Sequence, residues 1–199
     1  MAAQLVDDRH NPEIKITSNW KHLLDGNSTP TMAIVDSIGR PLPPNTFVID
    51  DVFSGTECTA LIDVAEAAGF GYTYFEKSYR GNLRLITIDE SLSSTMTERI
   101  NPFMPPTLEI EGETWKLIGL GDCWRIAKYY PGDKFGCHVD SRFLKTHYER
   151  STYTVNIYMN GDYTGGRTRF YNTLHDSNEV AAIQGDAGKA LIFMQPPGD

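Results

Sequence analysis

The chain has 199 residues, of which 40% are hydrophobic and 11% aromatic, so it can bury a core and wholesale disorder is excluded. Its net charge of −8, without a run of Lys or Arg, argues against nucleic-acid binding through phosphate contacts. Three cysteines at unrelated spacings indicate a reducing compartment, and the sequence carries neither a secretory signal nor an apolar run long enough to span a membrane. We therefore expect an intracellular protein, cytoplasmic or nuclear, with no nucleic-acid or membrane partner.

Residues 1–45 are expected to form an N-terminal arm or linker. The segment 17–27 predicts a short helix that ends near Gly26. The segment 28–45 contains four prolines and is typical of an extended connection. We therefore place the start of the folded domain at residue 46, so that residues 46–199 form the domain that carries the chemistry.

Two helices are expected early in this domain. After a strand in "TFVIDDVFS", Ser54 and Glu57 match a capping box, in which each side chain binds a free amide at the start of a helix. Apolar residues at helical spacing follow, and Gly69 suits the end of that helix. A second helix is expected from Asp89 and must stop before Pro102, because proline cannot continue a helix.

From about Thr107 the sequence changes to short segments rich in β-branched and aromatic residues, separated by turn signals. Many short strands at close spacing indicate an antiparallel sandwich or barrel, and helices that precede strands indicate helices packed on one face of a sheet. The predicted fold is therefore mainly β with flanking helices. The expected strands are 114–120, 123–130, 135–140, 153–160, 167–171, 179–183 and 189–194.

The candidate site lies in "YYPGDKFGCHVDS", which contains His138 and Asp140. Side chains alternate along a strand, so a strand here would point His138 and Asp140 the same way and Val139 the opposite way. Imidazole and carboxylate are the donors that non-haem iron(II) sites combine as two histidines and one carboxylate. Cys137 is expected to point away from this pair and to pack, as are Cys58 and Cys123.

A second strand supports a pocket. In "YTVNIYMN", Thr154, Asn156 and Tyr158 share one face and aliphatic residues share the other. A polar and aromatic face suits the interior of a barrel that holds a ligand, although an edge strand with its polar face in water has the same pattern.

Four segments resemble the iron(II)- and 2-oxoglutarate-dependent dioxygenases, in particular their prolyl 4-hydroxylase-like branch. They are 47–70, 129–141, 153–172 and 185–199. The resemblance implies a double-stranded β-helix, a jelly-roll or cupin-like fold, with His138 and Asp140 as iron ligands. It implies that Tyr158 and either Tyr130 or Tyr129 contact 2-oxoglutarate. Asn156 and Thr168, which face the same interior, complete the expected cosubstrate pocket.

The resemblance is incomplete at two positions. The family has a distal histidine as third iron ligand and a Lys or Arg that pairs with the C5 carboxylate of 2-oxoglutarate, and both follow the strand that corresponds to "KALIFM". No histidine follows His175 here, so we expect a domain that lacks its last strands. His147 and His175 are interpreted mainly as surface residues. Arg167 and Arg169 are the alternative carboxylate partners.

The resemblance implies an enzyme that uses Fe(II), 2-oxoglutarate and O2, with ascorbate as a further cofactor, to hydroxylate a C–H bond. The implied substrate is a peptidyl proline or another amino-acid side chain in a peptide or protein, and a small-molecule substrate stays open. Two alternatives remain. One is a β-helix module without catalytic activity, and the other is a cupin-like metal-binding protein that acts on another substrate.

Overall fold

The computed structural model describes residues 12–196, so the first eleven residues of the expected arm and the last three residues of the chain lie outside the described part. Strands account for 34% of the chain and helices for 17%, so the protein is mainly β with few helices. This confirms the predicted class at that level. Within residues 12–196, no helix is both long enough and apolar enough to cross a membrane.

The first sheet is built around β5, which pairs with the three other strands. β1 runs parallel to β5, whereas β4 and β8 run antiparallel to it. Alternate residues of β5 are fully buried, because one of its faces covers the main core. The strands of this sheet are β1 (Ile14–Thr17), β4 (Gly71–Tyr72), β5 (Leu83–Ile88) and β8 (Cys123–Lys128).

The second sheet has the order β11-β14-β3-β2 and is antiparallel throughout. β14 lies in the middle of this sheet and is almost entirely buried, since it has a paired strand on each side and a packed layer on each face. The strands are β2 (Thr31–Ala33), β3 (Thr46–Asp50), β11 (Tyr153–Ile157) and β14 (Ala190–Met194). β1 and β2 come from the expected arm, and each joins one of the two sheets.

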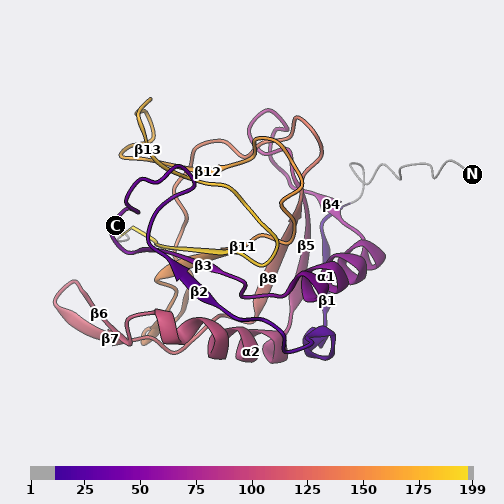
Figure 1. The fold of residues 1–199 in the computed structure, drawn as a ribbon, viewed down its shortest axis with the longest axis horizontal. Helices are drawn as coiled ribbons and strands as arrows, with labels where there is room; N and C mark the ends of the chain where they lie inside the picture. The colour runs from indigo at the N-terminus through magenta and orange to yellow at the C-terminus, as the bar shows by residue number, and fades with distance from the viewer. Residues whose placement is uncertain (1–11, 197–199) are drawn as a thin grey trace, which may run out of the picture.

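Two α-helices cover one side of the sheets (Figure 1). α1 (Gly55–Ala68) begins with the predicted capping box, and its C-terminal cap is Gly69, whose φ of 88° favours glycine. α2 (Glu90–Ile100) is capped by Asp89, and the short 3-10 helix η3 (Asn101–Phe103) follows it. Both predicted helices are thus confirmed. The expected helix in 17–27 is a single 3-10 turn, η2 (Trp20–Leu23).

The main core lies between these helices and the sheets. It includes Leu61 of α1, Met96 of α2, Leu85 of β5 and Ile192 of β14. Alternate residues of β11 and β8 pack against it from the strand side. Helices on one face of the strands were predicted from the sequence, and the main core is the result.

A second core lies on the opposite face of the second sheet. Val48, Ile183 and Leu191 are its buried residues, and Tyr158, Phe170 and Phe193 pack against them. The residues beyond the sheet come from β12 (Thr168–Tyr171) and β13 (Glu179–Ile183), an antiparallel pair that lies opposite α2 in Figure 1. The remaining strands form two hairpins, β6 (Thr107–Ile110) with β7 (Glu113–Lys116) and β9 (Leu144–Thr146) with β10 (Glu149–Arg150).

Candidate active site

His138 and Asp140 lie in an irregular segment between β8 and β9, where the sequence predicted a strand. That prediction is wrong, because this segment makes too few backbone hydrogen bonds for a ladder. Its backbone is tied to the loop that precedes β5 by Gly136 N to Tyr79 O at 2.6 Å and by Gly81 N to Lys134 O at 2.8 Å. These two bonds flank an isolated bridge between Arg80 and Phe135 and fix the segment without making it a strand.

The two side chains nevertheless face each other. His138 Nε2 lies 3.2 Å from Asp140 Oδ1, and Val139 between them is 55% exposed. His138 Nδ1 lies 2.8 Å from the carbonyl oxygen of Gly136, which can only accept, so Nδ1 carries a proton. The ring is therefore oriented with Nε2 directed at the carboxylate.

The electrostatics of the pair follow from this geometry. The hydrogen bond to Asp140 raises the pKa of His138, and burial opposes that effect. The hydrogen bond from His138 lowers the pKa of Asp140, and Thr154 lowers it further. When the imidazole is protonated, its Nε2 proton lies between the two side chains.

A chain of hydrogen bonds holds the second carboxylate oxygen of Asp140. Thr154 Oγ1 of β11 donates to Asp140 Oδ2 at 2.8 Å, and Gln195 Nε2 donates to Thr154 Oγ1 at 3.1 Å. Ser151 Oγ then donates to Gln195 Oε1 at 2.8 Å. The carboxylate is thereby oriented by residues of two neighbouring strands or strand ends, as is common for carboxylates that bind metals.

Tyr158 lies at the end of β11 on the same strand face as Thr154. Its hydroxyl lies 2.6 Å from Thr168 Oγ1 of β12, and burial raises the pKa of Tyr158 to about 12. Gly185 lies directly against this ring, since a Cβ there would be 2.5 Å from Tyr158 Cδ1 and would also meet the hydroxyl of Tyr163. The sequence analysis did not identify Tyr163, because its contact with Gly185 joins positions that are distant in the chain.

Of the other residues expected to contact the cosubstrate, Tyr130 lies against the core, whereas Tyr129 and Asn156 are exposed. Tyr130 packs against the main core, and its backbone N–H donates to Asp133 Oδ2 at 3.0 Å. Tyr129 is half-exposed, burial raises its pKa, and the charge of Arg80 opposes that rise. Tyr129 therefore lies within electrostatic reach of Arg80. Asn156 is exposed on β11.

The remaining candidates lie at the surface. His147 and His175 are exposed, and Arg169 is 56% exposed and ion-paired with Glu179 at 3.3 Å. Arg167 Nε is 3.4 Å from Gln184 Oε1. Among residues 12–196, no three His, Cys, Asp or Glu side chains gather as a metal site would require, so the pair contributes two donors.

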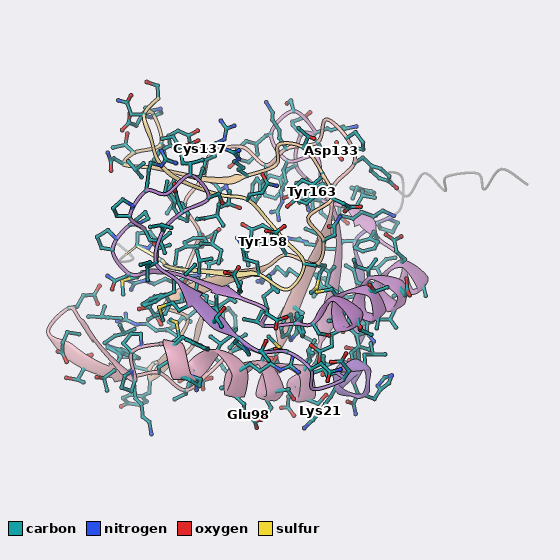
Figure 2. The ribbon with its side chains drawn as sticks, in the orientation of Figure 1. Lys21, Glu98, Asp133, Cys137, Tyr158 and Tyr163 are labelled. Carbon is teal, nitrogen blue, oxygen red and sulfur yellow. The ribbon has the colours of Figure 1, made fainter. Side chains whose placement is uncertain are left out.

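The prediction that all three cysteines pack inside the protein holds for one of them. Cys58 is buried as predicted, and burial raises its pKa to about 11. Cys123 and Cys137 are exposed, so the interpretation that they pack is wrong. Cys137 is exposed because its segment is irregular and has no covering layer. Figure 2 shows it on the side of β12 and β13, away from Lys21 and Glu98 near α2.

Aromatic and cationic groups continue from the pair along the loop before β5. The ring of Phe135 stacks on His138, with centroids 3.8 Å apart and an interplanar angle of 15°. The guanidinium of Arg80 lies 4.2 Å from the Phe135 centroid. The sequence analysis overlooked both residues, because Arg80 is far from the His138 segment in the chain and neither residue belongs to a recognisable motif.

A hollow of about 170 Å³ lies beyond Gln195, and neither His138 nor Asp140 lines it. The geometry around the pair therefore defines the site better than this hollow does. Comparisons with known proteins add no assignment: no family model matches the chain, and neither a curated protein nor a solved structure is detectably similar to it.

Proposed function

We propose that this chain carries the site of an iron- and 2-oxoglutarate-dependent dioxygenase that hydroxylates a C–H bond. One observation carries the proposal: Nε2 of His138 and Oδ1 of Asp140 converge at 3.2 Å while a separate hydrogen bond orients each side chain. Oriented donors of these two types are what a non-haem iron(II) site needs. The facing layers, with the second core between the β11 sheet and the β12–β13 pair, support a double-stranded β-helix.

The two residues fit iron as two of its ligands. A cation between Nε2 and Oδ1 would compete with a proton for Nε2, since a metal ligand must be unprotonated at the binding atom. Gly136 would keep the imidazole in the tautomer that leaves Nε2 for the metal, and Thr154 would keep the carboxylate from turning. When bound, iron would activate O2 for oxidation of the substrate. The substrate and 2-oxoglutarate would together provide the electrons that reduce O2.

The hydroxyl groups of Tyr158 and Thr168 suit the cosubstrate. Tyr158 packs against the second core and shares a hydrogen bond with Thr168, and it stays protonated at neutral pH because burial raises its pKa to about 12. A neutral phenol can donate to a carboxylate without adding charge. We assign Tyr158 and Thr168 to hydrogen bonding with 2-oxoglutarate, and Tyr129 to the opening of the site.

The surface beside the pair favours a polypeptide substrate, such as a peptidyl proline, over a small molecule. Val139, Phe143, Leu144 and Tyr148 follow one another along the segment from His138 through the β9–β10 hairpin, and each is at least 55% exposed. Several exposed apolar side chains in one short segment favour a surface that binds another molecule. A peptide that crosses this hairpin would bring a side chain to His138.

The first test is an anaerobic titration of the chain with Fe(II), followed by 2-oxoglutarate. The visible charge-transfer band of the iron–2-oxoglutarate complex is the readout. We expect the band in the wild-type chain and its loss in His138→Ala and Asp140→Asn. His147→Ala, which removes an exposed histidine, is the matched control and should keep the band.

The possible outcomes separate the functions. Metal binding that ignores 2-oxoglutarate would replace the proposal with a cupin-like metal-binding module. An absence of metal binding in both the wild-type chain and the His138 variant would overturn the iron site.

A further inference from the structure

Arg80 is a half-buried cation that lies between two aromatic rings. Its guanidinium carbon is 4.2 Å from the ring centroid of Phe135 and 5.5 Å from that of Phe75. Phe135 is also stacked on His138 at 3.8 Å, and two groups this close cannot occupy the same face of one ring. Arg80 and His138 therefore lie on opposite faces of Phe135.

The edge of the guanidinium is largely unused. Arg80 Nε donates to Asn82 Oδ1 at 3.1 Å, and Asn82 is itself 1% exposed and donates to the carbonyl of Leu83. Among residues 12–196, no carboxylate lies within ion-pair distance of Arg80. The remaining N–H groups are available for an acceptor in the guanidinium plane, where a carboxylate binds in bidentate fashion.

Charges of both signs act on Arg80. Burial lowers the pKa of Arg80, the charges of Arg84 and Arg125 lower it further, and Tyr129 and Asp140 oppose this shift. Arg84 is paired with Glu13, whereas Arg80 has no such partner in the described part of the chain. A partly desolvated cation without an acidic partner is costly, and an anionic ligand would offset that cost.

We propose that Arg80 binds a carboxylate of the ligand that occupies the site at His138. The inference deepens the proposed function and rests on it for the identity of the ligand. The carboxylate belongs either to the distal end of 2-oxoglutarate or to an acidic side chain of the substrate. In both cases Phe75 and Phe135 hold the guanidinium plane in a fixed orientation, and Asn82 fixes its Nε edge.

The first experiment uses the metal-free chain and therefore does not depend on an iron site. Glutarate is titrated in, and binding is followed by NMR of the Phe75 and Phe135 ring signals. We expect Arg80→Gln to weaken glutarate binding about 10- to 100-fold, the factor for losing a charge-assisted hydrogen-bonded pair. Arg80→Lys, which keeps the charge but not the planar fork, should fall between the two.

Arg125→Gln is the matched control, since it removes an equal charge that acts on Arg80 from the neighbouring strand β8. It should retain glutarate binding within about twofold, because the contact and not the net charge is proposed to matter. Thermal unfolding of each variant checks that it is folded. Equal glutarate affinity in the wild-type chain, Arg80→Gln and Arg80→Lys would overturn the inference, even if the iron complex forms.

A second experiment distinguishes the two sources of the carboxylate. The iron-loaded chain is titrated without oxygen with 2-oxoglutarate and with 2-oxopentanoate, which has the same chelating end but no distal carboxylate. If Arg80 holds the distal carboxylate, Arg80→Gln weakens only 2-oxoglutarate. If it holds a substrate carboxylate, both keto acids bind unchanged, and Arg80→Gln weakens N-acetylglutamate binding to the 2-oxoglutarate complex. No effect on any of these ligands would overturn the proposal.

Discussion

The two sides of the second sheet differ in how they hold their polar groups. On the helix side, Glu57 is fully buried and its carboxylate binds both N–H groups of the Arg99 fork, at 2.7 and 2.8 Å. The same carboxylate accepts the backbone N–H groups of Ser54, Asp25 and Gly26, so one side chain connects α1, α2 and the segment after η2. On the other side, His138 and Asp140 lie in an irregular segment and keep about a third of their side-chain surface in water, 32% and 27%.

This difference indicates that the polar groups on the helix side stabilise the fold, whereas those around His138 are open to a ligand. The helix side satisfies every oxygen of a buried carboxylate within the protein, so it has nothing left to bind. The site side orients its polar groups through single hydrogen bonds and leaves their reactive atoms accessible. We therefore expect substitutions on the helix side to change the free energy of unfolding strongly, and substitutions at the site to change binding with little loss of stability.

The largest effect is expected for Glu57→Ala. It removes the capping box and leaves the Arg99 charge buried without its partner, which should lower the free energy of unfolding by about 3–5 kcal/mol. Urea denaturation followed by tryptophan fluorescence measures this. Glu66→Ala on the same helix is the control, because the Glu66 side chain is 45% exposed in its ion pair with Lys128 and should contribute about 0–1 kcal/mol. Equal losses in the two variants would contradict the comparison.

An intermediate effect is expected for Tyr158 at alkaline pH. Its pKa is raised from 10.0 to about 12 in the folded protein, so the unfolded chain loses this proton first. Stability should therefore be intact below pH 10 and should fall as pH rises toward the folded pKa, by about 2–3 kcal/mol from this residue. The urea midpoint of Tyr158→Phe, measured across this range, should fall less than that of the wild-type chain. Tyr148→Phe, which alters an 86% exposed ring, should behave as wild type, and an identical fall in all three proteins would refute the assignment.

The smallest effect on stability is expected for Asp140→Asn in the metal-free chain. Because the hydrogen bond to Asp140 raises the pKa of His138, the variant should titrate His138 at lower pH, as NMR of the imidazole would detect. The pair stabilises the fold fully below the ordinary histidine pKa, and this contribution is lost as pH rises through the raised pKa.

The acid limit of this contribution comes from Asp140. Because the pKa of Asp140 is lowered, the stabilisation by the His138–Asp140 pair persists until the pH falls through the pKa of Asp140. A partly exposed pair of this kind contributes about 0.2–1 kcal/mol. Asp162→Asn, in an exposed turn, should leave the titration of His138 unchanged, and a His138 titration that is also unchanged in Asp140→Asn would rule out the hydrogen-bonded pair.

Local patterns in the sequence were sufficient for the elements that depend on neighbouring residues. The capping box of α1, the stop at Gly69 and the alternation of β11 all follow from contacts within a few positions. His138 and Asp140 also lie together as expected, although they belong to an irregular segment and not to the predicted strand.

The features that sequence analysis missed depend on distant contacts. The parallel pairing of β1 with β5 joins segments on either side of α1, and no local pattern of "IKIT" indicates its partner. Arg80 belongs to no recognisable sequence motif. Its stacking on Phe135 depends on the two backbone hydrogen bonds that join the loop before β5 to the His138 segment. Side chains selected by such long-range contacts become visible only once the chain is folded.

The bond from Gly136 N to Tyr79 O links the loop before β5 to the imidazole, since the carbonyl of the same Gly136 holds His138 Nδ1. Gly136 has no room for a side chain, because a Cβ there would lie 2.5 Å from the Tyr79 ring. The position of this loop and the orientation of the imidazole are therefore coupled through one glycine. A sequence change that reshapes the loop also acts on the direction in which His138 Nε2 points.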